Sequence, residues 1–536
     1  MKKQIDLQLL AVLIGGVIFN YLFWMEEQAL NLLLYSLFII VILLLDKEMP
    51  KSKKILLIGG SHLLAAILVL INQSDLTIIS WYISLAVFIG FAHFQSLRSI
   101  FTALIGTFLQ IVTVPVNLFR KLVAGRYSNV SFTPILKPIK YLVIPIIVLF
   151  LFSILYSIAN PVFAKYLDNM ITAIESALTS FFNFFFDELS FLRFMHFILG
   201  LLLATAIFIG FKDKALEGAE ALYTDKLLRQ RKSKGAFTIG YEIIAVFAGN
   251  LLNRKMALKT ENIIGIISFT ALNLLLLFLN AIDINTLWTA KTTGSNLSSE
   301  LHDGTNALII SIVMAMLVIV YFFSGNLNFY SKNKILRLLA YIWIIQNAFL
   351  VLSVLLRDYN YIDAYGLTYK RIGVMIFLLL CTIGLVTVYL KVAQQKTLFY
   401  LIRINSFIWY ILLLTFGMVN WDVFIVGYNI NNRGSIALDL DHLTSLSDKT
   451  LPLLHKNKTL LLSYLSTSKY ADSIIQGKSP DTIMSRAQSA ADQVQAFESD
   501  LKSRIIEFKQ TYANASWLSW NYRDWQTHQY LIMQHL

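Results

Sequence analysis

The chain has 536 residues, of which 57% are hydrophobic and 14% are charged, and its formal net charge is +13. This composition, with a mean hydropathy of +0.64, excludes an ordinary water-soluble domain and is typical of a polytopic membrane protein. The single cysteine, Cys381, excludes an intrachain disulfide and argues against a thiolate metal site.

Apolar runs of about 18 to 22 residues recur along the chain, which is the length that a hydrocarbon core of roughly 30 Å requires. The first run has no small-residue cleavage site and is followed at once by a second, so we expect a retained helix rather than a signal peptide. We predict an all-α fold, a polytopic transmembrane bundle of about eleven spans with a C-terminal helical domain outside the membrane. The predicted spans are residues 7–24, 29–45, 55–71, 76–94, 141–160, 194–211, 262–281, 305–323, 335–356, 371–391 and 401–421.

One further apolar run, "FTALIGTFLQIVTVPVNLF" at 101–119, is long enough to cross a membrane. It contains Gln110, Thr113, Pro115 and Asn117, and basic residues follow it directly. Because these polar groups would be costly in lipid, we predict that the run is re-entrant or interfacial.

The distribution of basic residues predicts the orientation. With a cytoplasmic N-terminus and no crossing at 101–119, cytoplasmic segments hold 28 Lys and Arg residues and the outer loops hold six. A crossing at 101–119 would turn the ten basic residues from Lys212 to Lys259 outward. We therefore predict a multi-pass protein of the cytoplasmic membrane with an extracytoplasmic C-terminal domain. Its positive charge then reflects orientation and contact with anionic lipid, and nucleic acid is not an expected partner.

Three regions outside the spans are long enough to matter. An outer segment at about 168–190 has apolar residues at helical spacing, which predicts an amphipathic helix on the membrane surface. The cytoplasmic loop 212–261 is basic, and its stretch 236–252 is apolar except for Glu242, so a hidden span there stays open.

The third region, residues 422–536, is polar and is called the tail below. Its helical periodicity from 479 onward begins with a capping pattern at Ser479, Pro480 and Asp481. The aromatic end, "SWLSWNYRDWQTHQYL", is typical of a helix docked on the domain or on the membrane interface.

Several segments resemble a bacterial family of multi-pass membrane proteins known as domain of unknown function 4173, a relative of domain of unknown function 4153. They are "NPVF", "LNLLLLFLNAIDINTLW", "YIDAYGLTYKR", "NWDVFIVGYNINNRGSIALDLDHLTSLSDKTLPLL" and the final "WLSWNYRDWQTHQYL". The resemblance covers residues 85–536, and it departs at His442, where relatives have Tyr. It implies a shared multi-pass architecture in a bacterial inner membrane and no established activity.

The first candidate site follows the predicted span 335–356. By the predicted orientation, this stretch is outside, so its basic residues violate the positive-inside bias. Asp358 and Asp363 are near enough in sequence to neutralise Lys370 and Arg371, which predicts an ion-pair cluster. It is either a buried clasp fixing two helices and the tail, or a binding site for an anionic ligand or lipid headgroup. The residues are Arg357, Asp358, Asp363, Tyr365, Gly366, Thr368, Lys370 and Arg371.

The second candidate site begins the tail with a run of acids and amides. Their oxygens could cradle a divalent cation or a sugar, although the spacing of an EF-hand is absent. A capped and turned linker between the last span and the tail is the alternative. The residues are Asn420, Asp422, Tyr428, Asn429, Asp439, Asp441 and Asp448.

Catalytic and cofactor motifs are missing from the sequence, so we predict no cofactor, no metal and no enzymatic activity. We predict recognition of a ligand, an anionic lipid or an envelope partner at the outer face. A transporter is the first alternative, although amides such as Gln346 and Asn347 are explained by hydrogen bonds between helices. A transferase acting on a lipid-linked substrate is the second alternative, by analogy with enzymes that carry an acid in the first outer loop, here Glu26 and Glu27.

Overall fold

The computed structural model describes residues 7–46, 52–124, 145, 148–150, 152–185, 190–210, 215–230, 250–252, 258–285, 297–434, 438–467 and 480–535. In this part of the chain the fold is all-α, except for two three-residue strands that pair in parallel. The helices α1–α12 and the strands are α1 (Leu7–Phe23), α2 (Leu30–Leu45), α3 (Lys53–Asn72), α4 (Asp75–His93), α5 (Ile100–Ala124), α7 (Pro161–Phe185), α8 (Phe191–Phe208), α9 (Ala215–Ala221), β1 (Leu228–Gln230), β2 (Asn250–Leu252), α11 (Leu258–Asp283) and α12 (Leu297–Phe322). The remaining elements are η2 (Asn326–Phe329), α13 (Lys334–Tyr365), α14 (Tyr369–Gln394), α15 (Leu398–Gly417), α16 (Trp421–Asn431), α17 (Leu440–Thr444), η3 (Asp448–Thr450), α18 (Leu451–Lys456), α19 (Lys458–Thr467), α21 (Pro480–Asn514), η4 (Trp517–Ser519) and α22 (Tyr522–Met533).

Seven of the described helices are long and apolar enough to cross a membrane, namely α3, α4, α8, α11, α13, α14 and α15. Shorter apolar helices lie at α1, α2, Ile100–Pro115, Val148–Ala159 and Ala307–Phe322. The chain is therefore a helical membrane protein. Four of the predicted spans, 7–24, 29–45, 141–160 and 305–323, coincide with shorter helices, so the count of eleven stays a prediction.

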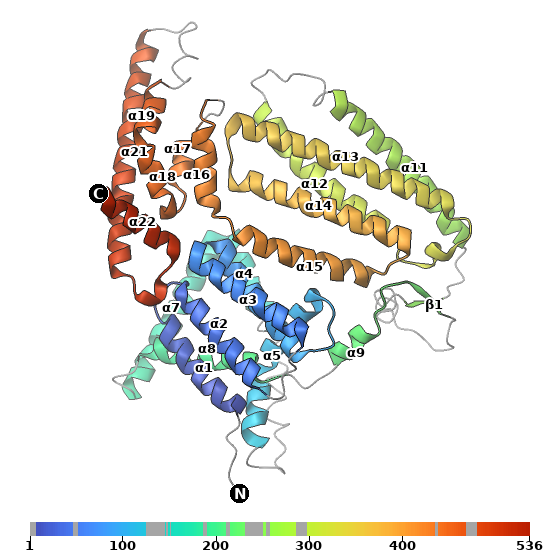
Figure 1. Cartoon of the computed structure of the whole chain (residues 1–536), viewed down its shortest axis with the longest axis horizontal. Coiled ribbons are helices and arrows are strands. Elements are labelled where there is room, and N and C mark those ends of the chain that lie inside the picture. The colour runs from blue at the N-terminus through green and yellow to red at the C-terminus, as the bar shows by residue number, and fades with distance from the viewer. Residues whose placement is uncertain are drawn as a thin grey trace. The chain divides into compact units, whose positions relative to one another are not determined.

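The chain divides into two compact units. Unit 1 comprises Met1–Leu97, Thr102–Glu217 and Ser516–Trp520, and unit 2 comprises Arg98–Phe101, Gly218–Ala515 and Asn521–Leu536. Nearly all of the tail is thus grouped with α11–α15. The helices of the tail are coloured orange to red in Figure 1. A separate domain beginning at residue 422 stays a prediction.

Glycines bring α1 and α8 together in unit 1. A Cβ on Gly16 would lie 2.6 Å from Leu201, and a Cβ on Gly200 would lie 2.7 Å from Phe19. Only a residue without a side chain allows this approach, as is common between membrane helices. The Nδ1 of His196 near the start of α8 lies 3.1 Å from the Oδ1 of Asn20 near the end of α1, so the two helices run antiparallel.

The run at 101–119 forms one continuous helix, α5, rather than a re-entrant hairpin. The Gln110 amide donates to Ala206 O at 2.9 Å and to Ile209 O at 2.7 Å, at the end of α8. Further along, Lys121 donates to Gln8 at the start of α1. The middle and the end of α5 thus contact the same end of the antiparallel α1–α8 pair, which favours the interfacial alternative.

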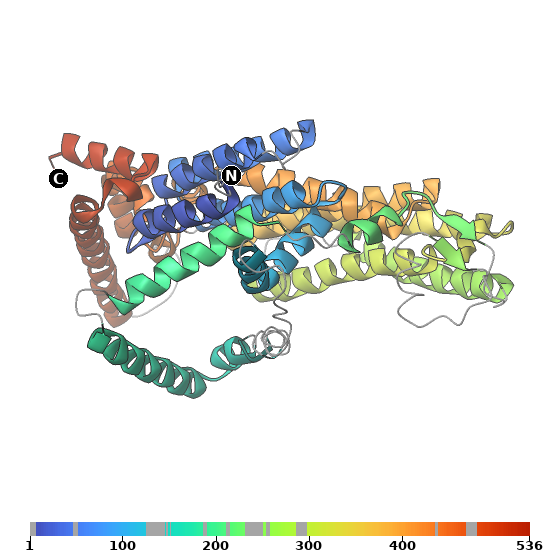
Figure 2. The ribbon, with the colours of Figure 1, turned by 90° about the horizontal axis from the view of Figure 1, so that it is seen from below.

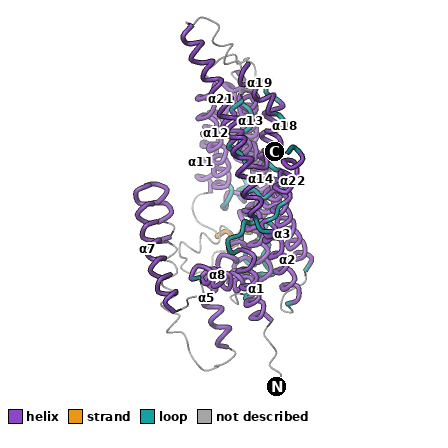
Figure 3. The backbone as a smooth tube through the Cα atoms, turned by 90° about the vertical axis from the view of Figure 1, so that its left-hand side faces the viewer, coloured by secondary structure: helices purple, strands orange, loops and turns teal. Residues whose placement is uncertain are grey.

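The chain between α5 and α8 passes from one end of α1 to the other, because Lys121 lies beside Gln8 and His196 lies beside Asn20. This segment includes the predicted span 141–160, of which residues 141–144, 146–147 and 151 lie outside the described part. It also includes α7, which replaces the predicted helix at 168–190 and stands away from α1–α4 (Figure 2, Figure 3). Apolar side chains of α7, such as Ile171 and Ile174, are exposed, as a helix on a membrane surface requires.

The predicted cytoplasmic loop 212–261 is only partly described. Residues 236–249 of the apolar stretch 236–252 lie outside the described part, and residues 250–252 form β2.

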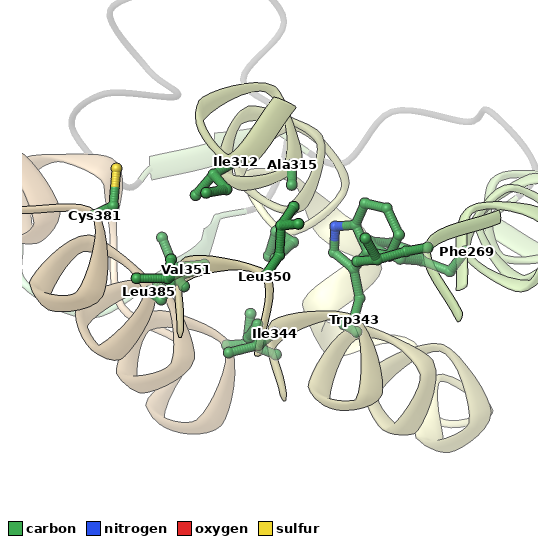
Figure 4. Close-up of a cluster of buried hydrophobic side chains, with 14 of the residues drawn as sticks. Phe269, Ile312, Ala315, Trp343, Ile344, Leu350, Val351, Cys381 and Leu385 are labelled. Atoms are coloured by element: carbon green, nitrogen blue, oxygen red, sulfur yellow. The ribbon is translucent and has the colours of Figure 1, made fainter. Parts of the chain in front are cut away.

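A bundle of α11–α14 forms the first core of unit 2. Figure 4 shows its centre, where Phe269 and Trp343 lie together on one side and Leu385 lies near Val351 on the other. Asn273 Nδ2 donates to Leu339 O at 3.0 Å, and Asn280 Nδ2 donates to Gln346 O at 3.3 Å. Because residue numbers rise together on both sides, α11 and α13 run parallel, as two spans separated by one return crossing must.

The tail forms the second core of unit 2. Buried residues of α16–α22, such as Ile425, Leu454 and Phe508, pack together in it. Three residues from the end of α13 and the start of α14 join this core, namely Ile362, Leu367 and Ile372. The helix predicted to start after Ser479 is α21, which begins at Pro480.

Candidate functional site

A glycine turn ends α13 and leads into α14. Gly366 has φ 79° and ψ −178°, a backbone conformation that is nearly restricted to glycine. The Arg371 guanidinium donates to Tyr365 O at 2.8 Å and to Gly366 O, and it stacks 4.2 Å from the centroid of the Tyr361 ring. Arg371 therefore caps the carbonyl end of α13, where the helix dipole favours a cation.

The ion pair of the first candidate site differs from the predicted one. Arg357 pairs with Asp283, the last residue of α11, and the Asp283 side chain is only 1% exposed. Within the described residues, Asp358 and Asp363 form no ion pair, and Lys370 is exposed. Arg371 is held by backbone carbonyls instead, so the neutralisation of Lys370 and Arg371 by these two acids does not take the form of direct ion pairs and stays a prediction.

An amide holds the turn to the tail. Asn429 in α16 accepts a hydrogen bond from Leu367 N at 2.6 Å and donates one to Leu367 O at 2.9 Å. Both residues are buried, so the amide satisfies two backbone groups that water cannot reach. Together with the burial of Ile362, Leu367 and Ile372 in the tail core, this pair forms what we call the clasp. Like the first predicted alternative it joins two helices and the tail, but it does so through an amide and apolar contacts rather than ion pairs, so the choice between a clasp and a ligand site stays a prediction.

Asp422 at the start of α16 extends the same contact. It accepts hydrogen bonds from the Tyr369 hydroxyl at 2.6 Å and from Ser447 Oγ at 2.5 Å. Asn420 caps α16 by accepting from Val423 N at 3.2 Å, and its Nδ2 donates to no described residue. The bonds of Asp422 join α14, α16 and η3, and the bond of Asn420 caps α16. These two residues of the second candidate site therefore stabilise the fold.

Two groups beside the clasp have unusual surroundings. Partial burial raises the pKa of Tyr428, and the neighbouring Tyr359 and Asp363 raise it further. Asp358 is buried, and its Oδ2 accepts no hydrogen bond from a described residue. Of the remaining predicted residues, Thr368 precedes α14 as its N-cap without a side-chain capping bond.

The other acids of the second candidate site, Asp439, Asp441 and Asp448, have different surroundings. Asp439 caps α17 by accepting from His442 N at 3.0 Å, and Asp441 is exposed. Asp448 accepts from Arg504 Nη2 at 2.7 Å, and Arg504 also binds the carbonyls of Thr444 and Leu446. In the part of the chain that the structure describes, no three His, Cys, Asp or Glu residues are arranged to hold a metal ion. Asn420 and Asp439 act as helix caps, as the capped-linker alternative expects, and a cation or sugar site stays a prediction.

The acids of the first loop also have structural contacts. Glu26 accepts hydrogen bonds from Ser516 Oγ at 2.6 Å and from Ser519 Oγ at 2.8 Å. Glu27 N donates to Ser519 Oγ at 3.0 Å. The loop carboxylate that suggested a transferase therefore binds the segment around η4.

A row of buried polar groups lies between α11 and α13, where hydrogen bonds between helices were expected for amides such as Gln346. Gln346 Nε2 donates to Asn273 Oδ1 at 3.0 Å, and the row continues through Asn280 to the Asp283–Arg357 pair. Four of its atoms have no hydrogen-bond partner among the described residues, namely Asn280 Oδ1, Asp283 Oδ2, Gln346 Oε1 and Arg357 Nε. The seven-residue spacing of Asn273 and Asn280, continued by Asp283 three residues on, is the sequence signal for this row.

The comparisons with curated proteins and with solved structures find no match. One family model matches residues 37–457, from α2 through the clasp to the end of α18. This model is that of domain of unknown function 4153, the relative of domain of unknown function 4173. The similarity to domain of unknown function 4173 itself stays a resemblance. Because the match covers most of the chain, the protein belongs to the family described as Domain of unknown function (DUF4153).

Proposed function

We propose that the protein is a non-enzymatic receptor-like protein of the bacterial inner membrane, which recognises a ligand, an anionic lipid or an envelope partner at its outer face. The observation that carries this proposal is the clasp. Because Asn429 binds both backbone groups of Leu367, a force on the tail acts directly on the turn between α13 and α14. The tail is in this way suited to pass an event outside the membrane to two spanning helices.

The proposed topology has eleven spans, a cytoplasmic N-terminus and an extracytoplasmic tail. The contacts of α5 with Gln8 and Ile209 support its position along the inner face of the membrane. The end of α5 lies beside Gln8, at one end of α1, and the start of α8 lies beside Asn20, at the other end. This separation supports a span in the segment that connects α5 to α8.

We expect a membrane-impermeant thiol reagent to label cysteines at Ala364 and Ser499, but not at Gly218, in intact cells. All three positions are exposed, and the buried Cys381 is replaced by Ala in the background. Permeabilised cells, in which all three cysteines should react, provide the control. Labelling at Gly218 alone in intact cells would put the clasp and the tail in the cytoplasm and overturn the proposal.

Recognition itself is tested with a photoreactive amino acid at Tyr365 or Lys370, which are exposed beside the clasp. Illumination of intact cells should give one discrete adduct of the protein at these positions. Lys502 on α21 is also exposed and is the matched control, at which we expect no adduct. If Tyr365 and Lys370 give the same pattern as Lys502, the clasp has only a structural role.

A transporter is the second candidate, and the buried polar row between α11 and α13 favours it. Unpartnered polar atoms within a membrane bundle are the places where water or a substrate is bound. Uptake of a substrate into vesicles that depends on Asn280 and Gln346 would favour this function over recognition.

A further inference from the structure

An apolar hollow lies between α2, α3 and α4 in unit 1. Its volume is about 100 Å³, and it is lined by Leu44, Ile55, Leu56, Gly60, Leu63 and Phe88 together with neighbouring apolar residues. A cavity of about 150 Å³ in a soluble protein can hold benzene, so this hollow has room for a short piece of hydrocarbon.

Two glycines of α3 contribute to the hollow. A Cβ on Gly59 would lie 3.2 Å from the Phe88 ring, whereas a Cβ on Gly60 would meet no atom within 4 Å. Gly60 thus leaves a space that a larger side chain could fill without displacing backbone.

The hollow lies at the end of unit 1 where basic residues gather. It contacts the start of α3 at Ile55, directly after Lys53 and Lys54. Lys54 is engaged, since its ammonium donates to Leu97 O and lies 3.8 Å from the centroid of the Phe91 ring. Lys53 is exposed and forms no ion pair with a described residue. Asp46, the acid at the end of α2, accepts from Gln8 at 2.8 Å.

We propose that this hollow binds one phospholipid with an anionic headgroup. An acyl chain fills the space beside Gly60, where it meets only apolar side chains. The phosphate lies at Lys53, whose ammonium can reach the headgroup level from the end of a spanning helix. The site goes beyond the proposed function, because it involves neither the clasp nor the tail.

The test compares the full-length protein with its Gly60→Leu variant, using phosphatidylglycerol as the probe. Native mass spectrometry after release from detergent should detect one bound phosphatidylglycerol on the wild type. A leucine at position 60 removes contacts with several methylene groups, so we expect a loss of bound lipid of about tenfold or more. Gly373→Leu in α14 is the matched control, because a Cβ there also meets no atom within 4 Å, and it should retain the lipid.

A second variant tests the headgroup. Lys53→Gln should keep a bound lipid but lose the preference for phosphatidylglycerol over phosphatidylcholine. The proposal is overturned if wild type and Gly60→Leu bind the lipid equally, or if the wild type shows no preference between the two lipids. A dimer of the wild type that Gly60→Leu abolishes would also overturn it, because the hollow would then be a contact between two copies. Gly60→Ala keeps the test usable if the leucine variant does not fold.

Discussion

Replacing Asp283 by asparagine is expected to destabilise the protein by about 3–5 kcal/mol, because it leaves the Arg357 guanidinium partly buried without a counter-ion. The carboxylate is almost fully buried at the end of α11, and the cation reaches it from α13. The loss should appear as a lower thermal unfolding temperature of the purified protein in detergent. The same measurement on Arg357→Gln should give a comparable loss, since the unpaired charge is then Asp283.

An exposed ion pair between a lysine and a glutamate provides the control. Lys458 Nζ lies 2.7 Å from Glu498 Oε1, and their side chains are 37% and 44% exposed. Exposed pairs are screened by water, so Glu498→Gln should cost less than about 1 kcal/mol. Asp283→Asn and Glu498→Gln could instead lower the free energy of unfolding by the same small amount. That result would mean that water reaches Asp283 and that the bundle is open at this end.

The double variant Asp283→Asn with Arg357→Gln distinguishes two causes of the lost stability. One is the loss of the ion pair itself, and the other is the cost of the buried charge that a single variant leaves unpaired. It removes both charges together and leaves two amides that can bind each other. We expect it to be more stable than either single variant, because no unpaired charge remains.

The positions of the helices could be predicted from the sequence because bilayer thickness fixes the length of an apolar run. All of α3, α4, α8, α11, α13, α14 and α15 lie where apolar runs were recognised. The position of α21 could be predicted for a different reason, since a serine and a proline mark the start of a helix. Such signals are local and need no knowledge of the fold.

Long-range pairing could not be predicted in the same way. Arg357 and Asp283 are 74 residues apart, and nothing local connects them. Asp358 is the acid next to Arg357 in the sequence, but adjacent residues of a helix point in different directions. The parallel packing of α11 and α13, which only the fold specifies, selects Asp283 instead.

The partners of the polar residues in α5 could not be predicted either. Gln110 is a reason to expect no crossing at 101–119, because an unpaired amide is costly in lipid. In the structure its amide is bound by two carbonyls at the end of α8. A single sequence does not reveal that such partners are present.

Asn429→Ala is expected to cost about 2–4 kcal/mol, because it leaves the buried N–H and C=O of Leu367 without partners. Those two groups are 2.6 and 2.9 Å from the amide in the wild type. Asn431 is two residues along the same helix and exposed, so Asn431→Ala should be close to neutral. Thermal unfolding in detergent measures both variants.

Limited proteolysis then tests whether this amide is what joins the tail to the membrane helices. If it is, Asn429→Ala should make the turn at Gly366 cleavable while α11–α14 stay protected, since the turn alone loses its cover. Asn429→Asp sharpens the result, because a carboxylate still accepts from Leu367 N but repels Leu367 O. An aspartate variant as stable as the wild type would mean that the apolar contacts of Ile362, Leu367 and Ile372 hold the tail without help from the amide.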